Sequence, residues 1–275
     1  MPVVKIIPTQ SLVTDDLTLK DKNVVVVDVL RAGSTILTAL SNGAKEIIPA
    51  ESTNVAVRIA KGSGKNTLLC GERGGKIVEG FNLGNSPFEY VKETVSGKTL
   101  VFSTTNGTLS IHKSRFAKNC VIASFLNFSK VLDYLQELDE DFIIICSGKL
   151  NNFCLEDFVF AGALLTILFK RSKNKRYYEI FDSELAAKKL AKIFAFESGN
   201  LSPDKILEMF LMCEHGIYLK SLGFEKDLEF CSRIDSYPYL PLFYKGVIKF
   251  RENIELEESN KKNFKKINLK QVQEK

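Results

Sequence analysis

Apolar runs alternate with amphipathic stretches along the first half of this chain, and the alternation predicts strands that are followed by helices. The first strand is expected over residues 24–28, because four consecutive valines are typical of a strand buried on both faces. A helix is expected over residues 34–42, because its apolar residues recur on one face and Gly43 follows as a helix-ending glycine. A second strand is expected over residues 46–49.

Two later segments repeat this order of strand, polar turn and helix. Strands are expected over residues 99–103 and 142–146, followed by a helix that ends near Lys113 and by a helix over residues 155–169. A short strand is expected between these units, over residues 121–124. Because crossover helices connect parallel strands, we expect an α/β fold with a mostly parallel or mixed sheet flanked by helices.

The segment over residues 70–87 differs from these units, since it holds five glycines and ends in a proline. This composition predicts neither a helix nor a plain strand, and irregular loops of such length are often functional. The second half of the chain is more helical. Helices are expected over residues 183–195 and 204–215, the latter with Pro203 in its first turn.

Residues 1–250 are expected to form the α/β unit that carries the functional site, either as one body or as two lobes. The lobes would cover about residues 1–125 and 126–250, with the site between them. Residues 251–275 are expected to be a charged C-terminal tail. Because glutamates lie directly upstream of its lysines, the tail is typical of a solvated segment, and no nucleic-acid partner is expected.

The composition also bears on the compartment. No apolar run approaches the roughly 20 residues that cross a bilayer, and the N-terminus lacks a signal-peptide pattern. We therefore expect a cytoplasmic protein without a membrane partner. The six cysteines are expected to be reduced and buried, and the absence of a Cys-x-x-Cys pair argues against a zinc cluster.

Asp28 and Arg31 stand at the carboxyl end of the first predicted strand, just before a helix. Ligands bind at this end of open α/β sheets, where a carboxylate can hold a metal ion and an arginine can hold an anion. Ser34, at the N-terminus of the helix, is a further candidate anion ligand. The group indicates phosphate chemistry assisted by a divalent cation. An equally open alternative is a carboxylate that only caps the helix and pairs with the arginine.

Missing motifs exclude several kinds of phosphate chemistry. No cysteine begins a Cys-x5-Arg loop, and no Asp-x-Asp pair follows a predicted strand, so two common phosphatase signatures are absent. The GSGK string over residues 62–65 lacks the four-residue gap and the hydroxyl residue of a phosphate-binding loop. No Gly-x-Ser-x-Gly nucleophile turn occurs either.

The glycine-rich segment supplies a second group of candidates. Glu72 and Arg73 lie among glycines, whose backbone amides an anion can approach closely. A surface turn with an ion pair is an equally open alternative. Asn85 and Ser86 end the segment, where plain turn chemistry is the favoured interpretation.

The turn after residues 99–103 supplies a third group of candidates. It offers three hydroxyls, an amide and a flexible glycine for binding an oxyanion, in the order Thr104, Thr105, Asn106, Gly107 and Thr108. A β-hairpin is an equally open alternative, because Asn-Gly is a strong hairpin signal.

Glu156 and Asp157 begin the apolar helix over residues 155–169. Acidic residues in a first helical turn are favoured by the helix dipole, which is the preferred interpretation of this pair alone. Two hard oxygen ligands drawn into the protein interior would instead suit Mg²⁺. His215 is expected to mark a helix end and His112 to lie on a helix surface, so neither is a strong candidate.

Five strings occur in order along the chain: VVVVDVLRAGST, NGAKEIIPA, CGERGGKIVEGFNLGNSP, TTNGT and LEDFVFAG. In this order they resemble the 2-phosphosulfolactate phosphatase family, over about residues 24–246. The resemblance implies the fold of that family, Mg²⁺ dependence and release of phosphate from 2-phosphosulfolactate. The pathway stays open between coenzyme M biosynthesis and other sulfonate metabolism. Gly33 and Cys154 depart from the family pattern, which usually has threonine and serine there.

On this basis we expect five catalytic residues: Asp28, Arg31, Glu72, Arg73 and Asn106. The expected substrate-binding residues are Arg31, Ser34, Arg73, Asn85, Ser86, Thr104, Thr105, Asn106, Gly107 and Thr108. The expected carboxylates around Mg²⁺ are Asp28, Glu156 and Asp157. Attack by water is favoured over attack by Asp28. The alternatives are a phosphatase for another small phosphorylated hydroxy acid and a non-catalytic phosphometabolite-binding protein, and a homodimer is compatible with either.

Overall fold

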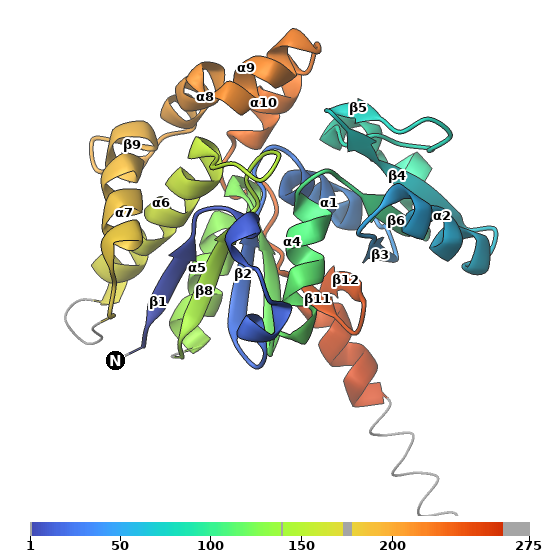
Figure 1. Ribbon diagram of the computed structural model, residues 1–275, viewed down its shortest axis with the longest axis horizontal. Coiled ribbons are helices and arrows are strands. Elements are labelled where there is room, and N and C mark those ends of the chain that lie inside the picture. Colours follow the sequence, from blue (N-terminus) through green and yellow to red (C-terminus); the bar gives the residue numbers. More distant parts are fainter. Residues whose placement is uncertain (1, 139, 173–177, 261–275) are drawn as a thin grey trace, which may run out of the picture.

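The structure is a computed structural model that describes residues 2–138, 140–172 and 178–260. A ten-stranded sheet runs through its centre and is flanked by helices (Figure 1). In spatial order its strands are β1 (Val4–Ile7), β8 (Phe142–Cys146), β2 (Asn23–Val27), β7 (Asn119–Ala123), β11 (Pro241–Tyr244), β12 (Val247–Phe250), β3 (Glu46–Pro49), β6 (Thr99–Ser103), β4 (Thr67–Arg73) and β5 (Lys76–Ile77).

The sheet consists of two parallel blocks. Strands β1, β8, β2 and β7 run parallel to one another, and so do β3, β6 and β4. The antiparallel hairpin β11–β12 lies between the blocks and pairs with β7 on one side and β3 on the other. The predicted α/β fold with a mixed sheet is therefore confirmed, whereas the insertion of a C-terminal hairpin into its middle was not predicted.

The predicted valine strand is β2, and it is buried on both faces. Val25 and Val27 belong to one hydrophobic core, and Val24 and Val26 belong to the other. This division follows from the strand, in which successive side chains point to opposite faces. The helices are α1 (Ala32–Ser41), α2 (Thr53–Gly62), α3 (Lys92–Val95), α4 (Gly107–Lys113), α5 (Phe128–Leu138), α6 (Leu155–Ser172), α7 (Asp182–Phe194), α8 (Pro203–Met212), α9 (Glu214–Ser221) and α10 (Glu225–Cys231).

Most predicted elements are confirmed in place. The strands predicted over residues 46–49, 99–103 and 142–146 have those bounds in the structure. The helix predicted over residues 204–215 is wrong at its end, since α8 stops at Met212 and α9 follows as a separate helix. A small hairpin of β9 (Phe196–Glu197) and β10 (Asn200–Leu201) precedes α8.

The prediction for residues 70–87 is partly wrong, because β4 continues to Arg73 and pairs with β5. Gly71 explains the difference. Its φ is +139°, and a Cβ there would lie 1.9 Å from the carbonyl oxygen of Ser103 on β6. The glycine thus permits a close approach of two backbones inside a sheet, where the composition alone indicated a break in the strand.

The fold continues beyond residue 250, where the charged tail was expected to begin. Residues 251–260 are helical, Ile254 is buried, and Arg251 bonds to Glu255 one turn along the helix. The lysines farther along the tail lie outside the described residues. Within the described ranges, no helix has both the length and the apolar character that a membrane crossing requires.

Candidate active site

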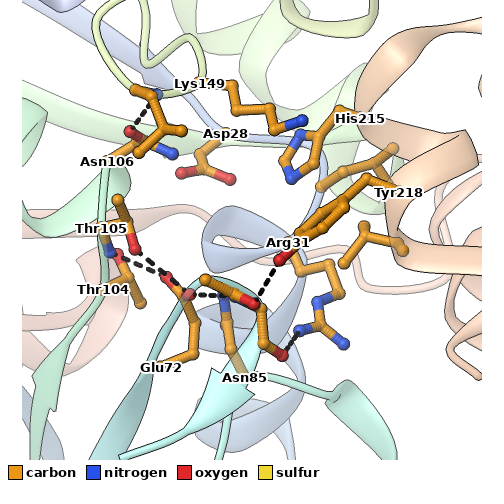
Figure 2. A pocket seen from close by; sticks show the side chains of 15 residues that line it. Asp28, Arg31, Glu72, Asn85, Thr104, Thr105, Asn106, Lys149, His215 and Tyr218 are labelled. Atoms are coloured by element: carbon orange, nitrogen blue, oxygen red, sulfur yellow. Dashed lines mark hydrogen bonds between the residues drawn. The ribbon is translucent and has the colours of Figure 1, made fainter. Parts of the chain in front are cut away.

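A cavity of about 210 Å³ lies where β2, β6 and β8 end, at their carboxyl ends (Figure 2). This is the edge at which open α/β sheets bind ligands. Helix α9 and the turn between β4 and β5 close the cavity from the other side. Its walls are formed by Asp28, Leu30, Arg31, Glu72, Gly74, Gly75, Asn85, Thr104, Thr105, Asn106, Lys149, Leu150, His215, Tyr218 and Leu219.

Asp28 follows β2 directly and is 7% exposed. Its Oδ1 accepts a hydrogen bond of 2.9 Å from the amide of Ala32, so it caps helix α1 as well as facing the cavity. Burial raises the pKa of Asp28 from 3.8 to about 6, the nearby Glu72 and Glu156 add to this rise, and His215 opposes it. One carboxylate therefore caps the helix and also faces the cavity, and its role in catalysis stays a prediction.

Arg31 is 2% exposed, and its positive charge is balanced by the carboxylate of Asp227. Its Nη1 lies 2.5 Å from Oδ2 of Asp227 on α10, and its Nη2 donates to the carbonyl of Gly75 at 3.0 Å. The guanidinium also lies 4.0 Å over the ring of Phe224. Arg31 thus ties α10 and the β4–β5 turn to the cavity wall, which sequence reasoning could not predict because Asp227 is remote in the chain.

Glu72 braces two walls of the cavity. Its Oε2 accepts from the Gly75 amide at 2.7 Å, and its Oε1 accepts from the Thr105 amide at 2.8 Å. Arg73 does not line the cavity. Its guanidinium instead donates to the carbonyl and the hydroxyl of Ser103 at 3.0 and 2.9 Å. Both residues therefore fix loops, and the Gly75 amide that was expected to meet an anion is already occupied.

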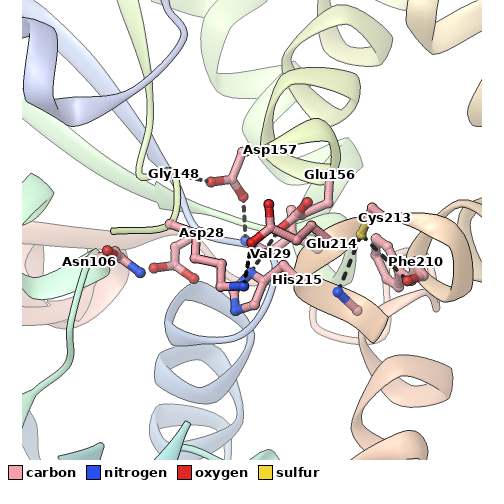
Figure 3. A network of polar contacts seen from close by, with 12 residues as sticks. Asp28, Val29, Asn106, Gly148, Glu156, Asp157, Phe210, Cys213, Glu214 and His215 are labelled. Atoms are coloured by element: carbon pink, nitrogen blue, oxygen red, sulfur yellow. Dashed lines mark hydrogen bonds and ion pairs between the residues drawn. The ribbon is translucent and has the colours of Figure 1, made fainter. Parts of the chain in front are cut away.

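The turn after β6 is not a hairpin, because Gly107 begins helix α4. Thr104 and Thr108 bind each other: each hydroxyl accepts from the other's amide, at 3.2 and 3.0 Å. Asn106 accepts from the Leu150 amide through Oδ1 at 2.9 Å. This bond orients the side chain so that its amide nitrogen points toward Asp28 (Figure 3).

Five of the predicted substrate-binding residues do not line the cavity. Ser34 donates to the Val29 carbonyl at 2.9 Å, and Ser86 donates to Oδ1 of Asp227 at 2.8 Å. Thr108 is buried in its exchange with Thr104, and Gly107 packs so closely that a Cβ there would lie 2.5 Å from Oδ2 of Asp28. The fifth is Arg73, whose guanidinium donates to Ser103. Their polar groups are used within the protein. Asn85, by contrast, lines the cavity, and its buried Oδ1 has no hydrogen-bond partner among the described residues.

Glu156 and Asp157 begin α6, and both are buried. Asp157 accepts from the amides of Val29 at 3.0 Å and Gly148 at 3.1 Å, so it joins the ends of β2 and β8. Burial, with Asp28 and Glu156 adding to it, raises the pKa of Asp157 well above its usual range. Besides any interaction with the helix dipole, Asp157 therefore holds two strand ends together through backbone hydrogen bonds.

Glu156 binds His215 across the interface between α6 and α9. Its Oε1 lies 2.8 Å from Nδ1 of His215, and its Oε2 has no hydrogen-bond partner within the described ranges. Burial raises the pKa of Glu156, but the His215 hydrogen bond and charge outweigh this effect and leave the pKa below its usual value. His215 was expected only to mark a helix end. It is instead the second residue of α9, and it lines the cavity.

Lys149 and Tyr218 are further cavity residues that sequence reasoning missed. Lys149 follows β8, lies 4.6 Å over the Tyr218 ring, and pairs with Glu214 at 2.9 Å. The hydroxyl of Tyr218 donates to the Gly74 carbonyl at 2.9 Å. The rule that found Asp28 at a strand end could also have found Lys149, whereas Tyr218 reaches the cavity only through the packing of α9.

The expected Mg²⁺ carboxylates are neighbours, but they do not share a preformed set of ligand atoms. Asp28 lines the first cavity, and Glu156 lines an adjoining one that shares Lys149 and His215 with it. Both oxygens of Asp157 accept backbone amides. The oxygens without a described hydrogen bond are Oδ2 of Asp28 and Oε2 of Glu156, and carboxylate oxygens of this kind fit a hard cation.

The fold and the cavity together define a class of protein. An α/β sheet with a carboxylate of raised pKa at a strand end, and cations on the same wall, is typical of an enzyme that acts on a small anion. The chain matches the family model described as 2-phosphosulpholactate phosphatase over residues 7–246. It belongs to the 2-phosphosulfolactate phosphatase family, whose members are named for hydrolysis of a phosphate monoester.

The relatives share most of their length with this chain. A Thermotoga maritima protein named "Probable 2-phosphosulfolactate phosphatase" is 42% identical over 231 residues, which cover 84% of this chain and 93% of that protein. A protein of that name from Caldanaerobacter subterraneus subsp. tengcongensis is 36% identical over 236 residues, or 86% and 93% of the two chains. One from Clostridium acetobutylicum is 34% identical over 230 residues, or 84% and 93%.

Proposed function

We propose that this protein hydrolyses the phosphate ester of 2-phosphosulfolactate to sulfolactate and phosphate, and that Mg²⁺ assists the reaction. The names of the relatives support the substrate. The observation that carries the proposal is the position of Asp28 in a cavity whose wall also holds the cations Arg31 and Lys149. A substrate with phosphate, carboxylate and sulfonate groups needs several such partners. A cytoplasmic location and a homodimer stay predictions.

The residues around Asp28 fit a magnesium ion. Asp28 would hold it through Oδ2, and Glu156 would have to approach it through Oε2 from the adjoining cavity, since each is a carboxylate oxygen without a described hydrogen bond. Among the described residues, the two carboxylates are not grouped as one ligand set. Asp157 completes the acidic group and, through its bond to the Val29 amide, positions the backbone beside Asp28. The ion would neutralise phosphate charge and acidify a water molecule.

Phosphoryl transfer depends mainly on positioning and charge stabilisation, and the cavity residues supply both. Lys149 and Arg31 attract the anionic groups, while the Asn106 amide nitrogen can donate to phosphate oxygens. The Thr105 hydroxyl already donates to Oε2 of Glu72 at 3.2 Å. Asp28, with a pKa raised to about 6, is largely ionised at neutral pH. Its Oδ2 serves either as the metal ligand or, in place of that role, as the base that accepts a proton from the attacking water. Direct attack by Asp28 on phosphorus remains the alternative.

The proposed substrate is tested by phosphate release from three compounds: 2-phosphosulfolactate, phosphoglycolate and 3-phosphoglycerate. We expect kcat/KM to be highest for 2-phosphosulfolactate, because only this substrate carries the sulfonate as well as the carboxylate. A higher value for either of the others would favour the alternative of a phosphatase for a different phosphorylated hydroxy acid. Binding of all three without phosphate release would favour a non-catalytic binding protein.

A further inference from the structure

A second cavity, of about 250 Å³, adjoins the substrate cavity on the far side of His215. It lies between the start of α6 and the start of α9 (Figure 3). Sulfur, carboxylate and imidazole groups meet on its walls, from Cys154, Glu156, Cys213 and His215. Such a mixture of donors is typical of sites for zinc and related divalent cations.

Three of these donors are already close together. Ligand atoms of Cys154, Glu156 and His215 all lie within 4.8 Å of one another, and within the described part of the chain this is the one such group of cysteine, histidine and acidic side chains. Zinc binds sulfur, nitrogen and oxygen at about 2.0–2.3 Å, so the three donors need only small side-chain movements to surround one ion.

Glu156, the acidic donor of this group, is buried and only partly hydrogen-bonded. Glu156 is 1% exposed, and its Oε2 has no hydrogen-bond partner among the described residues. Lys149 also borders the cavity, but its charge is paired with Glu214. An ionised, buried carboxylate without a full set of partners is costly, and a bound cation would remove that cost.

Cys213 is the less available of the two thiols. Its sulfur caps α9 by accepting from the Gly216 amide at 3.4 Å, and it donates to the Phe210 carbonyl at 3.4 Å. Three protein ligands therefore remain for the ion, and a tetrahedral cation would keep its fourth position for water.

We propose that Cys154, Glu156 and His215 form a binding site for Zn²⁺. On binding, the Cys154 thiol loses its proton to solvent and a sulfur–zinc bond forms. The thiolate and imidazole donors select zinc over magnesium. Because Glu156 is also a proposed magnesium ligand and His215 also lines the substrate cavity, occupancy by Zn²⁺ inhibits the phosphatase, a consequence that rests on the proposed function. The donors come from two helix starts, which explains why cysteine spacing gave no sign of the site.

Cobalt(II) binding to the full chain tests the site without any need for enzyme activity. With a reductant that contains no thiol, we expect one equivalent of Co²⁺ to give a thiolate-to-metal charge-transfer band that Zn²⁺ removes. The band is absent in Cys154→Ser and unchanged in Cys120→Ser, a matched control because Cys120 is also buried but lies on β7. No band in the wild-type protein, or a band that persists in Cys154→Ser, overturns the proposal.

Phosphate release with Mg²⁺ present tests the inhibition. Neither Cys154 nor Cys120 lines the substrate cavity, so both variants should keep the wild-type rate without zinc. We expect Cys154→Ser to need at least about 10-fold more Zn²⁺ for half-inhibition than the wild type or Cys120→Ser. The reason is that Cys154→Ser loses one ligand bond, and a 10-fold change in affinity corresponds to about 1.4 kcal/mol. Equal inhibition of all three would overturn the link to activity. A cobalt band in a protein with no phosphatase activity would instead refute the proposed function and leave the metal site standing.

Discussion

Replacement of Asp28 by asparagine is expected to lower kcat/KM for the phosphate ester by at least about 100-fold, whether Asp28 acts as a metal ligand, a base or a nucleophile. Asparagine keeps the size of the side chain and can still accept from the Ala32 amide. The helix cap therefore survives, and the loss reports on the carboxylate charge. The measurement is phosphate release at saturating Mg²⁺, with Asp133→Asn as a control on a half-exposed carboxylate.

The same variant should not be less stable than the wild type at pH 7. The pKa of Asp28 is raised by burial from 3.8 to about 6, so folding favours the protonated carboxyl. That contribution to the free energy of unfolding is fully present below pH 3.8 and is lost as the pH rises through about 6. Urea unfolding of the metal-free proteins checks this. The free energy of unfolding of Asp28→Asn, relative to that of the wild type, should be higher at pH 7 than at pH 4.

Wild-type phosphate release in Asp28→Asn would contradict the activity prediction and would remove Asp28 from the chemistry.

Replacement of Asp227 by asparagine is expected to lower the free energy of unfolding by about 3–5 kcal/mol, because it leaves the charge of Arg31 buried without its partner. The side chains of this ion pair are only 2% and 3% exposed, and Asp227 also accepts from the Ser86 hydroxyl. Activity should fall as well, since Arg31 holds the β4–β5 turn through the Gly75 carbonyl. Denaturant unfolding measures the first effect and phosphate release the second.

The matched control for Asp227 is Asp133, which forms an ion pair with Arg171. The side chain of Asp133 is 53% exposed and that of Arg171 is 42% exposed. Exposed ion pairs contribute at most about 1 kcal/mol, so Asp133→Asn should change stability by no more than that. If Asp227→Asn and Asp133→Asn had equal effects, water would have to reach Arg31, contrary to its burial in the structure.

The sequence predicted the sheet well, because local patterns determine much of it. The valines of β2 required burial on both faces, and the strands at residues 46–49, 99–103 and 142–146 have their predicted bounds. The central position of β11–β12 could not be predicted, since it depends on pairings with β7 and β3 that are remote in the chain. The β4 strand was missed in part because Gly71, which permits close packing, resembles a strand-breaking glycine.

The candidate site was predicted from strand ends, a glycine-rich segment, a helix start and the family resemblance, and the strand-end rule found Asp28 and the turn that contains Asn106. None of these patterns could distinguish polar groups that face the cavity from those used inside the protein, and Arg73 and Ser34 are of the second kind. His215 was undervalued because α9 is short and reaches the cavity only through tertiary packing. The missed residues thus mark contacts that no local pattern encodes.

Phosphate release is expected to depend on a divalent cation held by carboxylates beside the substrate. The most direct measurement is the rate of phosphate release from 2-phosphosulfolactate as Mg²⁺ is added to protein first stripped of metal with EDTA. The account predicts no release without metal and a saturable rise with Mg²⁺ that is absent in Asp28→Asn. Full activity in the stripped protein, or the same Mg²⁺ response in Asp28→Asn, would contradict it.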